Sequence, residues 1–157
     1  MFQLKGGNRM EKVMKKENYS EMPWQSADKL SLLFEQAITD FKNKKLTKKE
    51  FFDILDELTM RQGDTYENLK ESLRGELDNI LCSLWNTENY DDVDIITSLL
   101  INLGLKKTYN KMKESIKDLT NISPEILEEI KDTIEEAGDN IEDPYHDYMK
   151  KTTKQNP

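Results

Sequence analysis

Residues 46–58 read Leu-Thr-Lys-Lys-Glu-Phe-Phe-Asp-Ile-Leu-Asp-Glu-Leu, and this stretch decides the fold class. Thr47 and Glu50 have the spacing of a capping box, in which each side chain accepts a hydrogen bond from the other residue's backbone N–H. The apolar residues that follow recur at helical intervals and predict one buried face: Phe51, Leu55 and Leu58. The stretch is therefore predicted to begin a capped amphipathic α-helix.

The same helical periodicity continues on both sides of this stretch, whereas no segment alternates as a β-strand would. Ser26 and Ser123-Pro124 are good helix starts, and Gly104 and Gly138 are natural helix ends. Besides the helix that begins at Thr47, the pattern predicts helices over about residues 26–43, 65–86, 91–103, 109–119, 124–137 and 143–148.

We therefore expect an all-α fold of six to seven helices in antiparallel hairpins, arranged as a bundle or a short HEAT-like stack. The segments Ile95–Gly104 and Ile130–Gly138 resemble each other, since each is an apolar helix closed by glycine, and this repetition favours the stack. A single helical domain is predicted over residues 26–148. A flexible basic arm at 1–25 and a frayed Lys-rich tail at 149–157 are predicted on either side of it.

Acidic residues dominate the charge of the chain, which has a formal net charge of −8. Residues 50–104 contain 13 acidic and 3 basic residues, and residues 125–147 contain 10 acidic residues against one lysine. Both blocks would repel a phosphate backbone, so direct binding to nucleic acid is not expected. The same blocks would attract a basic protein and accelerate its association.

Residues suited to catalysis or metal binding are scarce. The chain has one histidine, His146, and one cysteine, Cys82. A zinc site or a Ser-His-Asp triad needs more than these residues offer, and no phosphate-binding glycine motif is present. We therefore expect no enzyme activity, no cofactor and no metal. One cysteine suits the cytoplasm, and no apolar run reaches the roughly 20 residues of a membrane helix.

Two acidic surfaces are candidates for binding a partner. The first is the predicted turn between the helices at 65–86 and 91–103, where aromatic and acidic residues meet as in many protein interfaces: Trp85, Glu88, Tyr90, Asp91, Asp92 and Asp94. The second is the outer face of the helix at 124–137: Glu125, Glu128, Glu129, Asp132, Glu135 and Glu136. Alternatively, Trp85 completes the core, the aspartates cap a helix, and the glutamates only face solvent.

In its small size, acidic charge and helical pattern, the chain resembles bacterial immunity proteins, which are typically small, acidic, helical and cytoplasmic. Residues 46–55 are similar to a helix start in colicin-type immunity proteins, although the Tyr-Tyr-Pro recognition segment of that family is missing. The length is closer to the helical immunity proteins of contact-dependent inhibition systems. This resemblance implies a monomer or weak dimer that blocks the active site of a basic toxin, with a nuclease as the expected toxin class.

Two other functions fit the same composition. The chain could be a phage-type inhibitor that mimics nucleic acid and occupies the DNA-binding groove of a host protein, in which case binding would compete with DNA. It could also be a helical adaptor that buries a partner helix against its aromatic stripe, in which case binding would survive high salt.

Overall fold

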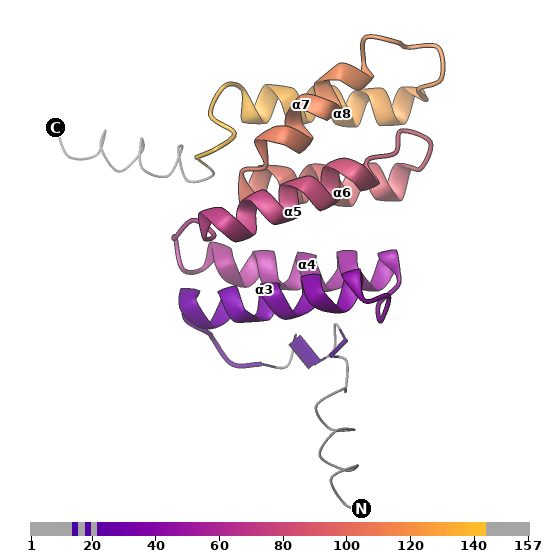
Figure 1. Ribbon diagram of the computed structural model, residues 1–157. Helices are drawn as coiled ribbons and strands as arrows, with labels where there is room; N and C mark the ends of the chain where they lie inside the picture. Colours follow the sequence, from indigo (N-terminus) through magenta and orange to yellow (C-terminus); the bar gives the residue numbers. More distant parts are fainter. Residues whose placement is uncertain (1–13, 16–17, 20–21, 144–157) are drawn as a thin grey trace, which may run out of the picture. The chain divides into compact units, whose positions relative to one another are not determined.

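A computed structural model describes residues 14–15, 18–19 and 22–143 of the chain, and all regular structure in these residues is helical, as expected (Figure 1). The expected tail at 149–157 and most of the expected arm at 1–25 lie outside the described residues, as does the helix expected over 143–148 apart from its first residue. The chain divides into two compact units, residues 1–61 and 62–157. No helix in the described part is long and apolar enough to span a membrane.

The first unit contains helix α3 (Ala27–Lys42) and all but the last two residues of helix α4 (Lys48–Gly63). The capping box predicted for α4 is present: the Glu50 backbone N–H donates to Thr47 Oγ1 at 3.1 Å, and the Thr47 N–H donates to Glu50 Oε1 at 2.9 Å. The predicted N-cap of α3 is present too, because Ser26 accepts a hydrogen bond from the Lys29 N–H. Local sequence therefore determines where both helices begin.

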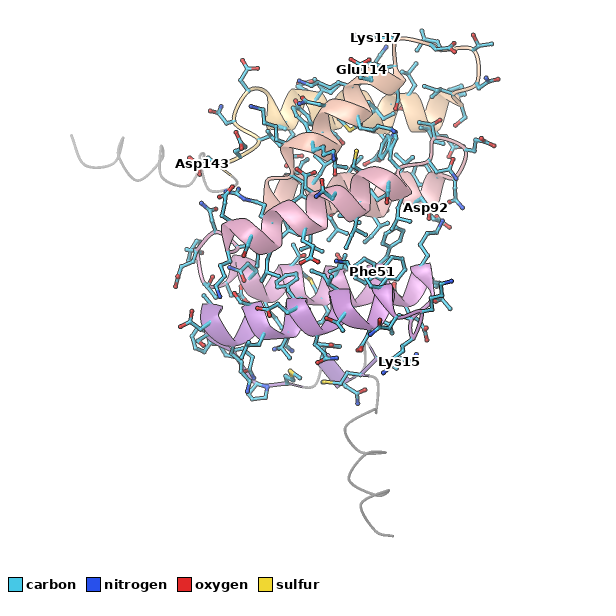
Figure 2. The ribbon with its side chains drawn as sticks, in the orientation of Figure 1. Lys15, Phe51, Asp92, Glu114, Lys117 and Asp143 are labelled. Carbon is cyan, nitrogen blue, oxygen red and sulfur yellow. The ribbon has the colours of Figure 1, made fainter. Side chains whose placement is uncertain are left out.

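Aromatic stacking joins α3 to α4 near the turn between them. The rings of Phe41 and Phe51 are parallel to within 7°, and their centroids are 4.2 Å apart. Phe51, which is labelled in Figure 2, is fully buried, as are Leu55 and Leu58. The apolar face predicted from the sequence is therefore the buried face of α4.

The second unit contains four helices in two layers: α5 (Glu71–Leu84), α6 (Tyr90–Leu103), α7 (Lys106–Ser115) and α8 (Pro124–Ala137). Helix α5 packs mainly on α7, and α6 packs mainly on α8. In Figure 1, α5 and α7 form the layer nearer the viewer and α6 and α8 the layer behind it. Two helical hairpins are therefore stacked, which is the HEAT-like arrangement that the sequence repetition favoured. The two similar segments belong to α6 and α8, which lie side by side.

The α5–α7 contact depends on a carboxylate that caps a helix other than its own. Asp78 of α5 accepts hydrogen bonds from the backbone N–H groups of Lys107 at 2.8 Å and Thr108 at 2.7 Å. The Thr108 hydroxyl also donates to Asp78 Oδ1 at 2.7 Å, and Thr108 is fully buried. These bonds satisfy free N–H groups in the first turn of α7, whose own N-cap residue, Leu105, provides no side-chain bond.

A second polar contact fixes the other end of the same pair. The Trp85 indole N–H donates to Ser115 Oγ at 2.7 Å, which links the end of α5 to the end of α7. In both contacts the partners are 30 residues apart in the sequence, Asp78 with Thr108 and Trp85 with Ser115. Helices α5 and α7 consequently run in the same direction, and so do the return helices α6 and α8 that follow them.

The helix predicted over residues 65–86 begins six residues later than expected, since α5 starts at Glu71. Helix α4 continues to Gly63, and the Thr65 hydroxyl donates to the Gln62 carbonyl at 2.7 Å instead of capping a new helix. Tyr66 has a positive φ of 55°, which is not a right-handed helical conformation, so it lies in the turn between α4 and α5. Tyr66 is consequently exposed and does not belong to the buried stripe of α5.

The helix predicted over residues 109–119 also differs in its bounds, because α7 covers Lys106–Ser115. It begins earlier than expected because Asp78 caps it from α5, and a cap from another helix has no local sequence signal. Leu119, the last residue of the predicted helix, lies beyond the end of α7 and is 56% exposed. The bounds of α8 agree with the prediction, including Pro124 at the first helical position.

We predict that Asp78→Ala lowers the free energy of unfolding by about 2 kcal/mol, because it removes the acceptor of the exposed Lys107 N–H, the partly buried Thr108 N–H and the Thr108 hydroxyl. Urea unfolding at neutral pH measures the change. Glu135→Ala on the exposed side of α8 is the control and should stay within about 0.5 kcal/mol of the parent. Equal effects of the two substitutions would show that the Asp78 cap does not hold α7.

Candidate functional site

A groove of about 230 Å³ lies between the parallel helices α6 and α8. Its lining residues recur every three or four positions on both helices, so they lie on one side of each helix. The lining residues are Asp94, Thr97, Ser98, Ile101 and Asn102 from α6, and Glu129, Asp132, Thr133 and Glu136 from α8. Four of these nine residues are acidic and none is basic, so the groove is strongly negative.

Local capping positions the α6 side of this groove. The Asn89 side chain accepts a hydrogen bond from the Asp92 N–H at 3.1 Å and starts α6 at Tyr90. Gly104 ends the helix in the left-handed conformation, with φ 71° and ψ 53°. Tyr90, Asp94 and Ile101 then follow at four- and seven-residue intervals, which places them on one side of the helix.

On α8, the residue spacing separates two acidic faces. Glu129, Asp132 and Glu136 recur at three- and four-residue intervals and face the groove. Glu128 and Glu135 are seven residues apart and lie on the outer, exposed face instead. The second acidic surface expected from the sequence is thus divided between the groove and the solvent-facing side of α8.

Glu129 is the central acid of the groove and is bound from α6. Its carboxylate accepts a hydrogen bond from the Thr97 hydroxyl at 3.3 Å and another from the Tyr90 hydroxyl at 3.4 Å. Thr133, one turn further along α8, is buried and donates to the Glu129 backbone carbonyl at 2.8 Å. Two buried threonines therefore hold the partly exposed Glu129, Thr97 through its carboxylate and Thr133 through its backbone carbonyl.

The phenol of Tyr90 responds to the negative charge of the groove. The negative charge of Glu129 raises the pKa of Tyr90 above its usual value, and the charges of Asp94 and Glu125 raise it in the same direction. Tyr90 keeps 41% of its surface exposed, so the aromatic ring stands beside the carboxylates and is accessible from solvent. Asp94 and Glu129 come from different helices, and their common effect on one phenol shows that the two acidic segments converge.

The structure thus brings together five of the residues predicted from the sequence, namely Tyr90, Asp94, Glu129, Asp132 and Glu136. The other predicted residues of the turn lie elsewhere. Trp85 is half-buried and bonds to Ser115 of α7, which places it in the α5–α7 contact. Asp92, labelled in Figure 2 at the start of α6, is buried, whereas Glu88 and Asp91 are exposed outside the groove lining.

Five lining residues were not predicted from the sequence: Thr97, Ser98, Ile101, Asn102 and Thr133. The small polar residues of α6 follow Asp94 at helical spacing, but polar residues on a helix usually face solvent. Only the pairing of α6 with α8 shows that these residues line a groove.

The chemistry available in this groove is the binding of a positively charged group. The carboxylates, hydroxyls and amide supply hydrogen-bond acceptors, and the four acids supply negative charge. Within the described residues, no ion pair from a lysine or arginine reaches Asp94, Glu129, Asp132 or Glu136. No three His, Cys, Asp or Glu side chains in this part of the chain are close enough together to hold a metal ion.

We predict that Glu129→Gln lowers the pKa of the Tyr90 phenol toward its ordinary value of about 10, because it removes the largest of the charges that raise this pKa. NMR titration of the protein with labelled tyrosine measures this pKa directly. Glu128→Gln, one residue away on the exposed face of α8, is the control and should leave the Tyr90 titration unchanged. A shift of the same size in both variants would contradict the groove geometry.

Comparison with known proteins does not add a relative to this picture. No family model matches the chain, and neither a curated protein nor a solved structure is significantly similar to it.

Proposed function

We propose that this chain is an inhibitory binding protein that receives basic side chains of a partner protein in the α6–α8 groove. The observation that carries the proposal is the convergence of acids from two parallel helices around one partly exposed carboxylate, Glu129. No described lysine or arginine neutralises the groove carboxylates from within the chain. A partner cation would therefore remove the repulsion between them as well as form new bonds.

The size and composition of the groove favour a protein side chain as the ligand. Its volume of about 230 Å³ is below the roughly 300 Å³ at which pockets for small molecules begin. Such a space suits the end of an arginine or a lysine. Arginine fits better, because its planar guanidinium presents five N–H donors to acceptors that lie around it, and carboxylates, Thr97 and Asn102 provide such acceptors.

Tyr90 extends this site with an aromatic surface. Its ring is 41% exposed and stands beside Glu129, to which its hydroxyl donates. A cation held by the carboxylates can also contact the face of this ring, which adds about 0.5–1 kcal/mol at an exposed site. An aromatic anchor surrounded by a charged rim is a common arrangement in protein interfaces.

The resemblance to immunity proteins supplies the class of the partner. We propose a toxin with a basic active-site cleft, and a nuclease is the first class to test because it must attract a phosphate backbone. The acidic protein would then occupy the cleft that nucleic acid normally enters. Steric and electrostatic blockade of the active site is the resulting mechanism.

The experiment has two stages, of which the first is capture of the partner. The full chain is tagged and used to capture proteins from its native organism, with washes at low and then high salt. We expect one stoichiometric basic protein with a toxin-like catalytic domain, released by high salt. A housekeeping DNA-binding protein, displaced by DNA, would favour the nucleic-acid mimic instead. A partner retained at high salt would favour an adaptor that binds through apolar surface.

The second stage compares two variants that remove the same charge from different faces. The groove variant is Asp94→Asn, Glu129→Gln, Asp132→Asn and Glu136→Gln, and the control variant is Glu88→Gln, Asp91→Asn, Glu128→Gln and Glu135→Gln. The groove variant should weaken partner binding by about 100-fold or more, because contacts to desolvated charges are lost. The control should weaken it less than about tenfold, because exposed charges act mainly on the association rate. Equal losses would contradict a specific role for the groove.

A further inference from the structure

Helix α7 and the turn after it carry a basic surface between two acidic segments. Residues 105–124 contain five lysines against two acids, whereas residues 50–104 and 125–147 are strongly acidic. Four of the five lysines are exposed and one is half-buried, so they lie away from the buried side of α7, which includes Tyr109 and Met112. We call this surface the lysine face: Lys106, Lys107, Lys111, Lys113 and Lys117.

The lysine face is weakly neutralised within the described residues. Lys117 and Glu114, both labelled in Figure 2, lie 3.0 Å apart, and Lys106 lies 3.6 Å from Glu142. Each of these four side chains is at least 60% exposed, and exposed ion pairs contribute little to stability. Lys111 is exposed and makes no ion pair with any described residue. The face therefore keeps positive charge for a partner surface.

The charges at two helix ends oppose the helix dipoles. The first turn of α7 contains Lys106 and Lys107 and no acid, although the N-terminal end of a helix favours negative charge. The last turn of α8 contains Glu135 and Glu136 and no basic residue, although the C-terminal end favours positive charge. Both placements destabilise the free chain, and such departures from local preference are typical of functional surfaces. Because the charges have opposite signs, the two surfaces are complementary.

The lysine face and the α6–α8 groove belong to different layers of their unit. Helix α7 lies in the layer nearer the viewer of Figure 1, and the groove is formed by the layer behind it. No lysine lines the groove, and no described lysine forms an ion pair with its acids. The two complementary surfaces of one copy therefore stay apart, and a second copy can bring them together.

We propose that the chain associates head to tail with a second copy, whose lysine face enters the α6–α8 groove. The inference rests on the proposed function, because it gives the groove a ligand of the same chemistry, a basic protein side chain. We assign Lys111 to the groove, since its ammonium group loses no described ion pair on entering. Such a contact is heterologous: each copy offers its lysine face to one neighbour and its groove to another.

Self-association of this kind is weak and regulates access to the groove. The net charge of −8 repels a second copy, although salt screens this repulsion beyond about 8 Å at physiological ionic strength. Lysine is also a poorer ligand than arginine for the groove, because its ammonium is a compact and strongly hydrated point charge. A partner that inserts an arginine therefore displaces the second copy, and the groove is covered until this partner arrives.

Analytical ultracentrifugation of the full chain, from micromolar to millimolar concentration at physiological ionic strength, tests the proposal. We expect the average mass to rise with concentration and to pass the mass of a dimer, because a heterologous contact leaves a free surface at each end. A chain that stays monomeric over this range, or a mass that levels off at a dimer, would overturn head-to-tail association.

Two variants that each remove three lysines locate the basic half of the contact. The face variant is Lys106→Gln, Lys111→Gln and Lys117→Gln, and the matched control, at exposed positions elsewhere, is Lys29→Gln, Lys45→Gln and Lys70→Gln. Both change the net charge by the same amount, so general repulsion affects them equally. The face variant should weaken self-association by about tenfold or more, and the control by less than about threefold. Equal losses would contradict a specific role for the lysine face.

A mixing experiment tests both halves of the contact with the four-site groove variant described under the proposed function. This variant should stay monomeric, even though the loss of four negative charges reduces the repulsion between copies. Mixed with the face variant, it should form a one-to-one dimer that does not grow, because its intact lysine face meets the intact groove of the other variant. Absence of this dimer, or self-association of the groove variant at the parental strength, would overturn the proposal.

These outcomes are distinct from those that test the proposed function. A groove variant that loses the captured partner but still self-associates would remove the head-to-tail contact and leave the proposed function standing. A groove variant that keeps the captured partner but forms the one-to-one mixed dimer would support the head-to-tail contact and contradict the proposed function.

Discussion

The register of α5 against α7 depends on one carboxylate, Asp78, which caps a helix that is not its own. A helix terminus needs acceptors for its first N–H groups, and α7 has no suitable residue at Leu105. Asp78 supplies these acceptors from α5, and Trp85 with Ser115 fixes the other end. Because each of these helices is followed by a return helix, the same register places α6 beside α8. The acidic groove is thus a geometric consequence of a contact in the other layer.

The groove itself concentrates like charges, which destabilises the folded chain. Asp94 and Glu129 belong to different helices, yet the negative charge of each raises the pKa of Tyr90, because both carboxylates lie near its phenol. Buried Thr97 and Thr133 hold the backbone and carboxylate of Glu129 in place without neutralising it. Such an arrangement is typical of a binding surface, where the stability lost in the free protein is recovered when a cation of the partner arrives. The rest of the unit is then held by other contacts, among them the cap that Asp78 of α5 provides for α7.

The sequence was sufficient to predict what depends on local chemistry. The all-α class and the capping box at Thr47 and Glu50 are confirmed, and the repetition between α6 and α8 corresponds to two neighbouring helices. The error at the start of α7 arises because a distant residue, Asp78 of another helix, caps it. The error before α5 is local, because the Thr65 hydroxyl donates to the Gln62 carbonyl three residues earlier. The groove could be predicted only in part, because two acidic segments were identified as separate surfaces and their convergence depends on the packing of α6 on α8.

The most direct test of the proposed function is a hydrogen–deuterium exchange footprint of the full chain bound to its captured partner, compared with the free chain. Slower exchange should be concentrated in α6 from Tyr90 and in α8 from Pro124, with no comparable change in the α5–α7 layer. A footprint centred on α5, α7 or the first unit, with α6 and α8 unaffected, would contradict the proposal that the acidic groove receives the partner.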